Sequence, residues 1–241
     1  DVERSRGLGD VYKRQEYKYV TTGDKGETIA LATYGEIFSI TRQAIINDDL
    51  NALTDVPAKM GRAAKATIGD LVYAILLDNP KLSDGKPLFH ADHKNLSSGA
   101  ISVSSIDDAR KLMRLQKEGE RTLNIRPAYM LVPVGLETLA NQTIKSASVK
   151  GADINSGINN PIQNFAEVIS EPRLDHKDPN AWYLAAAKGT DTIEVAYLNG
   201  VDTPYIDQQE GFNTDGIATK VRIDAGVAPL DFRGLTKSTG K

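Results

Sequence analysis

The sequence predicts an α+β protein in which a layer of strands covers one long helix. Between residues 46 and 80, apolar residues recur at steps of three and four, as they do on one face of a helix. Turn residues divide most of the remaining chain into short strand-like runs. The sequence contains no Walker motif, no dinucleotide-binding motif and no Gly-x-Ser-x-Gly. We therefore expect the function to depend on architecture rather than on a reaction centre.

The long helix is expected at residues 55–78. Thr54 and Asp55 supply side-chain oxygens where a helix begins, and Pro57 is compatible only with a first turn. Asn79-Pro80 ends the helix, which at 1.5 Å per residue is about 36 Å long. Its apolar face consists of Leu53, Met60, Ala64, Ile68, Leu71 and Ile75, and three basic residues lie off that face: Lys59, Arg62 and Lys65.

Composition and charge exclude several classes of function. The 241 residues are 25% charged and 40% hydrophobic, which suits a globular chain with a sizeable core. The absence of cysteine excludes disulfides and thiolate chemistry. A net charge of -3 argues against a general nucleic-acid-binding protein. Because no apolar run is long enough to cross a bilayer, we expect no membrane partner.

Residues 1–15 differ from the rest of the chain. They are highly charged and have no apolar period. The run GLGDVYKRQ within them resembles a translated sequencing-adapter scar. We expect a non-native or disordered leader here, and a genuine flexible arm is the alternative.

Residues 16–47 predict a long β-hairpin before the helix. Its strands are expected at 17–21, 27–32 and 36–46, with a turn at 23–26 and a bend at Tyr34-Gly35. An isolated hairpin is marginally stable in water, so this one should pack on its own domain or on another subunit.

The elements expected after the helix alternate between helix and strand. Residues 81–100 predict a long loop, residues 106–118 a helix capped by Ser104 or Ser105, and residues 134–145 another helix. The loop at 150–161 is polar and rich in Gly and Asn. Strands are expected at 127–133, 165–170, 182–187, 193–198, 204–209, 217–225 and 228–235.

His90-Ala-Asp-His93 is the one cluster that resembles a metal site. Zinc hydrolases place two histidines four residues apart on a helix, whereas these lie three apart on a loop, and the only other histidine is His176. A structural role is favoured, in which Leu88-Phe89 anchors the loop and the His and Asp side chains bond to its backbone. A metal-dependent hydrolase using His90, Asp92 and His93 remains a remote alternative. We assign no catalytic, cofactor-binding or metal-binding residue and expect no enzyme.

Two predicted helices carry a basic face. One consists of Lys59, Arg62 and Lys65, and the other of Arg110, Lys111, Arg114 and Lys117. A solvated surface explains both most simply. The alternatives are a surface that faces a packaged polyanion and the positive side of salt bridges between subunits.

Five long blocks of the sequence resemble the major capsid proteins of tailed double-stranded-DNA phages, which have the Hong Kong phage fold. These blocks are residues 30–65, 87–95 (PLFHADHKN), 123–140 (LNIRPAYMLVPVGLETLA), 178–186 (DPNAWYLAA) and 194–234. Within that fold, they are most similar to the Mu-like prophage head subunits, known also as the capsid half of a prohead protease–major capsid fusion.

The resemblance implies an arrangement of domains. Residues 16–47 would be the extended β-hairpin loop, and residues 48–100 a peripheral domain with the spine helix and the loop that follows it. Residues 101–190 would be the axial domain, and residues 191–241 peripheral-domain strands that return to the axial domain.

The resemblance also implies a function. The chain would be a structural major capsid subunit of the virion, which self-assembles through hexamers and pentamers into an icosahedral shell around double-stranded DNA. Assembly would take place in the host bacterial cytoplasm with a prohead protease or scaffold and a portal, and contact with DNA would be non-specific. The family supplies no catalytic residues. The alternative is the shell protein of a cellular nanocompartment, similar to encapsulins.

Overall fold

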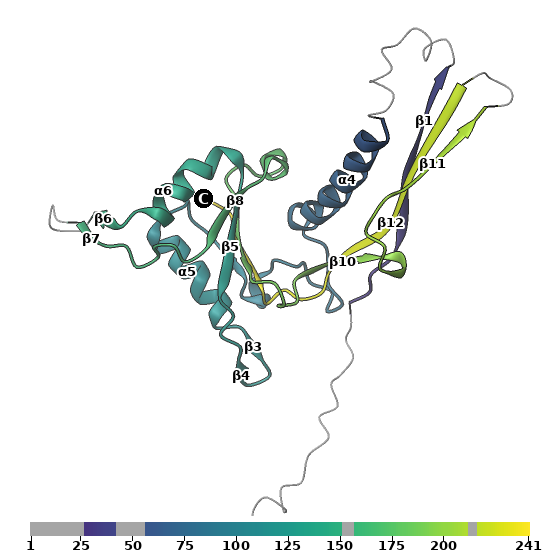
Figure 1. Ribbon diagram of the computed structural model, residues 1–241. Coiled ribbons are helices and arrows are strands. Elements are labelled where there is room, and N and C mark those ends of the chain that lie inside the picture. The colour runs from purple at the N-terminus through teal and green to yellow at the C-terminus, as the bar shows by residue number, and fades with distance from the viewer. Residues whose placement is uncertain (1–26, 42–55, 151–156, 212–215) are drawn as a thin grey trace, which may run out of the picture.

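The computed structural model describes residues 27–41, 56–150, 157–211 and 216–241. Figure 1 shows a rounded lobe on one side, an elongated group of strands on the other, and helix α4 (Val56–Asp78) between them. The leader expected at 1–15, the strand at 17–21 and the turn at 23–26 lie outside the described residues.

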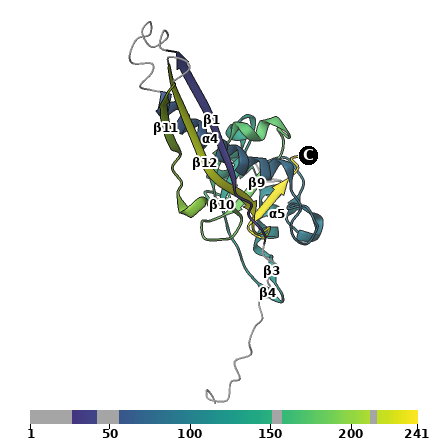
Figure 2. The ribbon, with the colours of Figure 1, turned by 90° about the vertical axis from the view of Figure 1, so that its right-hand side faces the viewer.

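Three antiparallel strands, which we call the blade, form the elongated part. They are β1 (Ala32–Thr41), β11 (Tyr205–Glu210) and the central β12 (Gly216–Pro229). β1 pairs with one edge of β12 and β11 with the other, while β10 (Ile193–Tyr197) pairs with the base of β12. Figure 2 shows the blade extending beyond the rest of the molecule.

The prediction of the long helix is confirmed, and α4 packs on the blade through its apolar face. Ile68 lies with Ile223 and Ala225 of β12 in a small core between the helix and the strands. Pro57 falls in the first turn, and Asn79 ends the helix with a left-handed φ of 51°. Leu53, which was expected on the apolar face, lies outside the described residues.

The rounded part, which we call the α/β lobe, is built on a five-stranded sheet of order β2-β13-β9-β5-β8. Helices α5 (Val103–Arg114) and α6 (Glu137–Lys145) form a core with one face of the sheet, where Met113 packs with Met130 and Trp182. The other face packs against the C-terminal end of α4, because successive side chains of a strand alternate between faces. The strands are β2 (Leu96–Ser97), β5 (Pro127–Val132), β8 (Glu167–Ser170), β9 (Trp182–Ala186) and β13 (Leu235–Ser238).

Short elements complete the described chain. The two-stranded pairs are β3 (Lys117–Glu118) with β4 (Arg121–Thr122), and β6 (Ser148–Lys150) with β7 (Gly157–Asn159). The 3-10 helices are η1 (Ala91–His93), η2 (Val134–Leu136), η3 (Pro172–His176) and η4 (Leu198–Gly200). No helix in the described part of the chain is long and apolar enough to span a membrane.

The described part of the segment before α4, residues 27–41, differs from the prediction. One continuous strand, β1, replaces the strands predicted at 27–32 and 36–46, and it runs through Tyr34-Gly35 without the expected bend. Its partner is β12, which is distant in sequence, so the pairing could not be inferred from neighbouring segments.

Two further predictions are wrong in their boundaries. The strands expected at 217–225 and 228–235 are largely one strand, β12, because Gly226 continues the ladder instead of breaking it. The helix expected at 106–118 is α5, whose N-cap is Ser102 rather than Ser104 or Ser105. Ser102 accepts a hydrogen bond from the backbone of Ser105 in a capping box, which moves the start to Val103.

Candidate assembly surface

The blade has two chemically distinct faces. Val221 and Ile223 of β12 point toward α4, and their partners on β1, Glu36 and Tyr34, lie on the same side. Alternation along β1 places Phe38 on this helix-facing side and Ile37 on the opposite side.

Both faces expose apolar side chains. Ile37 is 68% exposed and Phe38 is 46% exposed, although they are adjacent in β1. Tyr205 and Ile206 are likewise exposed on opposite faces of β11. An antiparallel sheet usually buries one face and exposes the other to water, so exposed apolar groups on both faces indicate a binding surface. The sequence signal that could have identified it is the pair of adjacent apolar residues in each strand, Ile37-Phe38 and Tyr205-Ile206.

The outer face, which is turned away from α4, also carries positive charge. Lys220 and Arg222 of β12 lie on it, as the alternation of residues 219–224 indicates. The Arg222 guanidinium lies 4.7 Å from the centre of the Tyr205 ring. This cation–π contact holds the arginine flat on the strand and leaves the outer face both basic and aromatic.

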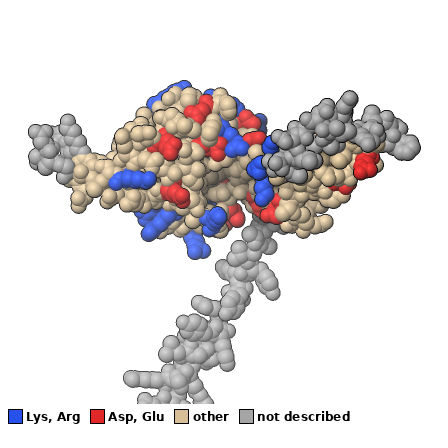
Figure 3. Space-filling view, turned by 45° about the horizontal axis from the view of Figure 1, so that its top comes forward, with Lys and Arg blue, Asp and Glu red and all other residues tan. Residues whose placement is uncertain are grey.

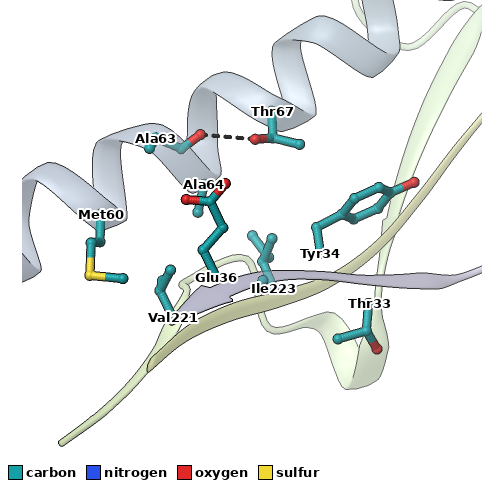
Figure 4. A pocket seen from close by; sticks show the side chains of 10 residues that line it. Thr33, Tyr34, Glu36, Met60, Ala63, Ala64, Thr67, Val221 and Ile223 are labelled. Atoms are coloured by element: carbon teal, nitrogen blue, oxygen red, sulfur yellow. Dashed lines mark hydrogen bonds between the residues drawn. The ribbon is translucent and has the colours of Figure 1, made fainter. Parts of the chain in front are cut away.

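A cavity of about 400 Å³ lies between the N-terminal half of α4 and the blade. Met60 and Ala64 line it from the helix, and Tyr34, Glu36 and Val221 line it from the strands (Figure 4). The Thr67 hydroxyl donates to the Ala63 carbonyl, so it does not take part in binding across the gap. Ile68 packs with Ile223 and Ala225 beside this cavity, and Glu36 supplies the one carboxylate in its lining.

Arg173 of η3 joins α4 to the α/β lobe. Its guanidinium bonds to Asp70 of the helix and to Glu171, with an Nη1–Oε1 distance of 2.9 Å for the latter. It also lies 5.7 Å from the Tyr73 ring centre. The pKa of Arg173 is raised, first by the bond to Asp70, so its charge is secure. The joint fixes the helix, and with it the blade, relative to the lobe.

Two tyrosines lie at the same joint. Burial, followed by the charge of Glu171, raises the pKa of Tyr73. Burial raises the pKa of Tyr183 to about 12, and the Tyr183 hydroxyl donates to the Leu76 carbonyl at 3.4 Å. Both groups are therefore neutral over the physiological range and act as hydrogen-bonding and packing groups.

The structure agrees with the structural interpretation of the His90–His93 loop for Leu88, Phe89 and the two histidines, whereas the Asp92 carboxylate pairs with the Lys86 side chain rather than with the backbone. Leu88 and Phe89 are buried, and His93 Nδ1 lies 3.1 Å from the Leu88 carbonyl oxygen. His90 Nδ1 accepts from the backbone N–H of Asp92. The second nitrogen of His93, Nε2, lies 2.7 Å from Asp84.

This geometry does not gather metal ligands. Both nitrogens of His93 are directed at oxygen atoms of the protein, and the Asp92 carboxylate pairs with Lys86 at 2.7 Å. Among the described residues, no group of three His, Asp or Glu side chains is arranged to hold a metal ion. His176 lies in η3, on a different element.

The two basic helix faces predicted from the sequence differ in their surroundings. Lys59, Arg62 and Lys65 are all exposed on α4. On α5, Lys111 pairs with Asp107 and Asp108, whereas Arg114 bonds to the neutral Asn124. Figure 3 shows charges of both signs interspersed over one face, with Lys and Arg gathered along the lower edge of the lobe on the left.

The fold and the exposed blade define a shell-forming subunit of the Hong Kong phage fold. The capsid protein of cyanophage Pam1 matches 87% of this chain and 74% of its own, with 12% identity and a TM-score of 0.58. That of cyanophage P-SCSP1u matches 93% and 79%, with 11% identity and a TM-score of 0.57. The SrpI encapsulin of Synechococcus elongatus PCC 7942 matches 86% and 73%, with 12% identity and a TM-score of 0.52. No curated protein matches the sequence.

Sequence comparison assigns the family. The model of the phage capsid protein family matches residues 26–238, which is nearly the whole chain. The chain belongs to the phage capsid protein family and is a capsid protein of the phage head.

Proposed function

We propose that this subunit self-assembles into an icosahedral shell that encloses double-stranded DNA, and that its role is structural rather than enzymatic. The observation that supports this most directly is the blade, with Ile37 and Phe38 exposed on opposite faces. Burial of both side chains requires a cover on each side of the sheet. Within the described residues, α4 covers only the base of one face.

A second copy of the chain is the proposed cover. Fully burying an apolar side chain of this size contributes about 1.5–3 kcal/mol, so a few such residues per contact can stabilise an assembly of many repeated contacts. The blade extends beyond the rest of the molecule, and so it can reach a neighbouring copy (Figure 2).

The finer assignments belong to the same proposal. The copies would form hexamers and pentamers, with a prohead protease or scaffold and a portal acting during assembly in the host bacterial cytoplasm. In domain terms, α4 would be the spine helix of the peripheral domain, and the α/β lobe would correspond to the axial domain. The similarity of the five sequence blocks to Mu-like head subunits supports that narrower family.

Sedimentation and electron microscopy of the purified chain test this proposal. The wild type is expected to form shells, rings or capsomers. The double variant Ile37→Ser/Phe38→Ser should remain monomeric. The matched control, Leu115→Ser/Val134→Ser, removes two exposed apolar residues from the α/β lobe and should still assemble.

Circular dichroism and urea unfolding would separate loss of assembly from loss of folding. Because all four positions are exposed in the subunit, both double variants should fold with little change in stability. A strictly monomeric wild type, or equal loss of assembly in both variants, would contradict the proposal.

An encapsulin-like nanocompartment shell is the second candidate, because the SrpI encapsulin shares the fold. The contents of the shell distinguish the two. Nucleic acid in purified particles, and genes for a portal and terminase nearby, would support a phage head. A cargo enzyme in the particle and in the gene neighbourhood would support a nanocompartment.

A further inference from the structure

Three arginines line one hollow on the surface of the α/β lobe. The hollow has a volume of about 310 Å³ and is bordered by Arg110 and Arg114 of α5, by Arg126, and by Pro127 and Phe165. We call it the arginine pocket. It is separate from the blade and from the cavity beside α4.

The local fold brings these side chains together. Arg110 and Arg114 are four residues apart and therefore lie on one face of α5. Ile125 packs toward the core, which leaves Arg126 on the outside at the start of β5. Phe165, two residues before β8, packs against the core and lines the hollow together with Pro127, the first residue of β5.

Positive charge in the pocket is only partly balanced. Arg110 pairs with Asp107, but the same carboxylate also binds Lys111 at 2.7 Å. Arg114 Nε donates to the side-chain oxygen of the neutral Asn124 at 2.9 Å. Within the described ranges, no carboxylate forms an ion pair with Arg114 or Arg126.

Like charges four residues apart on a helix repel each other, and this arrangement therefore destabilises the empty pocket slightly. The bond to Asn124 nevertheless holds Arg114 in place and leaves its terminal nitrogens free to bind a ligand. Asn124 itself has a left-handed φ of 50°, a conformation that asparagine tolerates better than most residues. Two of the three guanidinium groups, those of Arg110 and Arg114, are thus held in place while donors remain for an anion.

We propose that the arginine pocket binds a phosphate of a nucleic-acid backbone and is a point at which the capsid protein contacts packaged DNA. This inference rests on the proposed function. Guanidinium groups match phosphate oxygens with paired hydrogen bonds, and three of them can surround one phosphate. The hollow admits a phosphate with its sugar, and Phe165 offers the sugar an apolar surface. A local site of this kind is compatible with the net charge of -3 of the whole chain.

The test measures binding of a short fluorescein-labelled double-stranded DNA to the full chain by fluorescence anisotropy, between about 50 and 200 mM KCl. The triple variant Arg110→Gln/Arg114→Gln/Arg126→Gln should weaken binding at least about tenfold and lower the salt slope by about 2–3. The matched control is Lys59→Gln/Arg62→Gln/Lys65→Gln, which removes the same charge from the exposed face of α4. It should weaken binding by less than about threefold.

Two further variants distinguish a specific phosphate site from non-specific electrostatic attraction of DNA. Arg126→Gln alone changes an exposed side chain and should keep the fold while weakening binding. The triple Arg→Lys variant keeps the charge but loses the paired donors, so it should bind with intermediate affinity. Absence of DNA binding by the wild type, or equal loss in the pocket variant and the α4 control, would overturn the inference.

Electron microscopy of the same proteins separates this inference from the proposed function. If wild-type shells form and the pocket variant binds DNA normally, the pocket inference fails and the shell remains. If the wild type never assembles, the proposed function fails. If the pocket variant keeps its DNA affinity but loses assembly, the occupant is a carboxylate of a neighbouring copy, and the phosphate assignment is wrong.

Discussion

The imidazole of His93 is stacked on the ring of Phe232, with centroids 4.0 Å apart and planes 5° from parallel. His93 belongs to the loop that follows α4, and Phe232 to the segment between β12 and β13. The contact therefore connects the loop that follows α4 to the segment through which the chain passes from β12 in the blade to β13 in the α/β lobe. His93 Nδ1 donates to the Leu88 carbonyl, and Nε2 faces Asp84, so the ring is held on three sides.

Removing the aromatic ring at 232 should loosen this junction. Phe232→Leu keeps an apolar side chain but loses the stack, and we expect a loss of about 1 kcal/mol in the free energy of unfolding. Urea unfolding measures it. Phe232→Tyr retains the ring and serves as the control. Equal stability of the Leu variant and the wild type would show that the stack contributes nothing.

Acid should weaken the same loop through Asp84. Its carboxylate accepts from His93 and from the Lys86 backbone N–H, and these bonds, that of His93 first, lower the pKa of Asp84 below its usual 3.8. A carboxyl whose pKa is lowered by folding stabilises the protein above its unfolded pKa, and this contribution is lost as pH falls through the folded value. We expect the wild type to lose stability below about pH 4 more steeply than Asp84→Asn does.

The control for the acid experiment is Asp202→Asn. Asp202 is exposed and, among the described residues, forms no hydrogen bond or ion pair. This variant should keep the acid dependence of the wild type, as measured by thermal unfolding at several pH values. An Asp84→Asn variant with the wild-type pH profile would contradict the argument.

Two neighbouring positions at the C-terminal end of α5 differ sharply in burial. Met113 is fully buried, whereas Leu115, two residues further, is 67% exposed. Met113→Ala should therefore cost about 2–5 kcal/mol in the free energy of unfolding. Leu115→Ala should change it by less than about 0.5 kcal/mol. Similar losses in the free energy of unfolding at the two positions would mean that α5 does not pack on the sheet through the face that carries Met113.

The sequence predicted most of the helices and strands but not how the strands pair. The 3.6-residue period located α4 to within one residue, because helix signals are local. Pairing of β1 with β12 depends on residues nearly two hundred positions apart, and no local pattern encodes that register. The strands predicted at 217–225 and 228–235 left a gap that includes Gly226, whereas β12 is continuous there. In the structure, a Cβ at 226 would lie 2.3 Å from the Ala30 carbonyl oxygen, so close approach of the backbone requires glycine there.

The candidate site was predictable only in part. Basic and apolar residues alternate in the sequence of residues 219–224, and the structure places Lys220 and Arg222 on one face and Val221 and Ile223 on the other. The exposure of Ile37 could not be inferred, because alternation assigns a residue to a face without saying what covers that face. The sequence also did not identify Arg126 as part of a site. Arg126 lies on a different segment from Arg110 and Arg114, and only the folded chain brings the three side chains together.

Gly35 provides a direct test of the pairing between β1 and β12. A Cβ at this position would lie 2.6 Å from the Val221 carbonyl oxygen, and backbone atoms cannot move aside as the end of a flexible side chain can. Gly35→Val should therefore destabilise the blade by about 1–3 kcal/mol despite the better strand propensity of valine. Ser39→Val, on the same face of β1 and exposed, is the matched control and should be neutral or stabilising. Hydrogen exchange of the β1 amides measures the effect, and equal protection in the two variants would show that β1 does not pair with β12 in the free subunit.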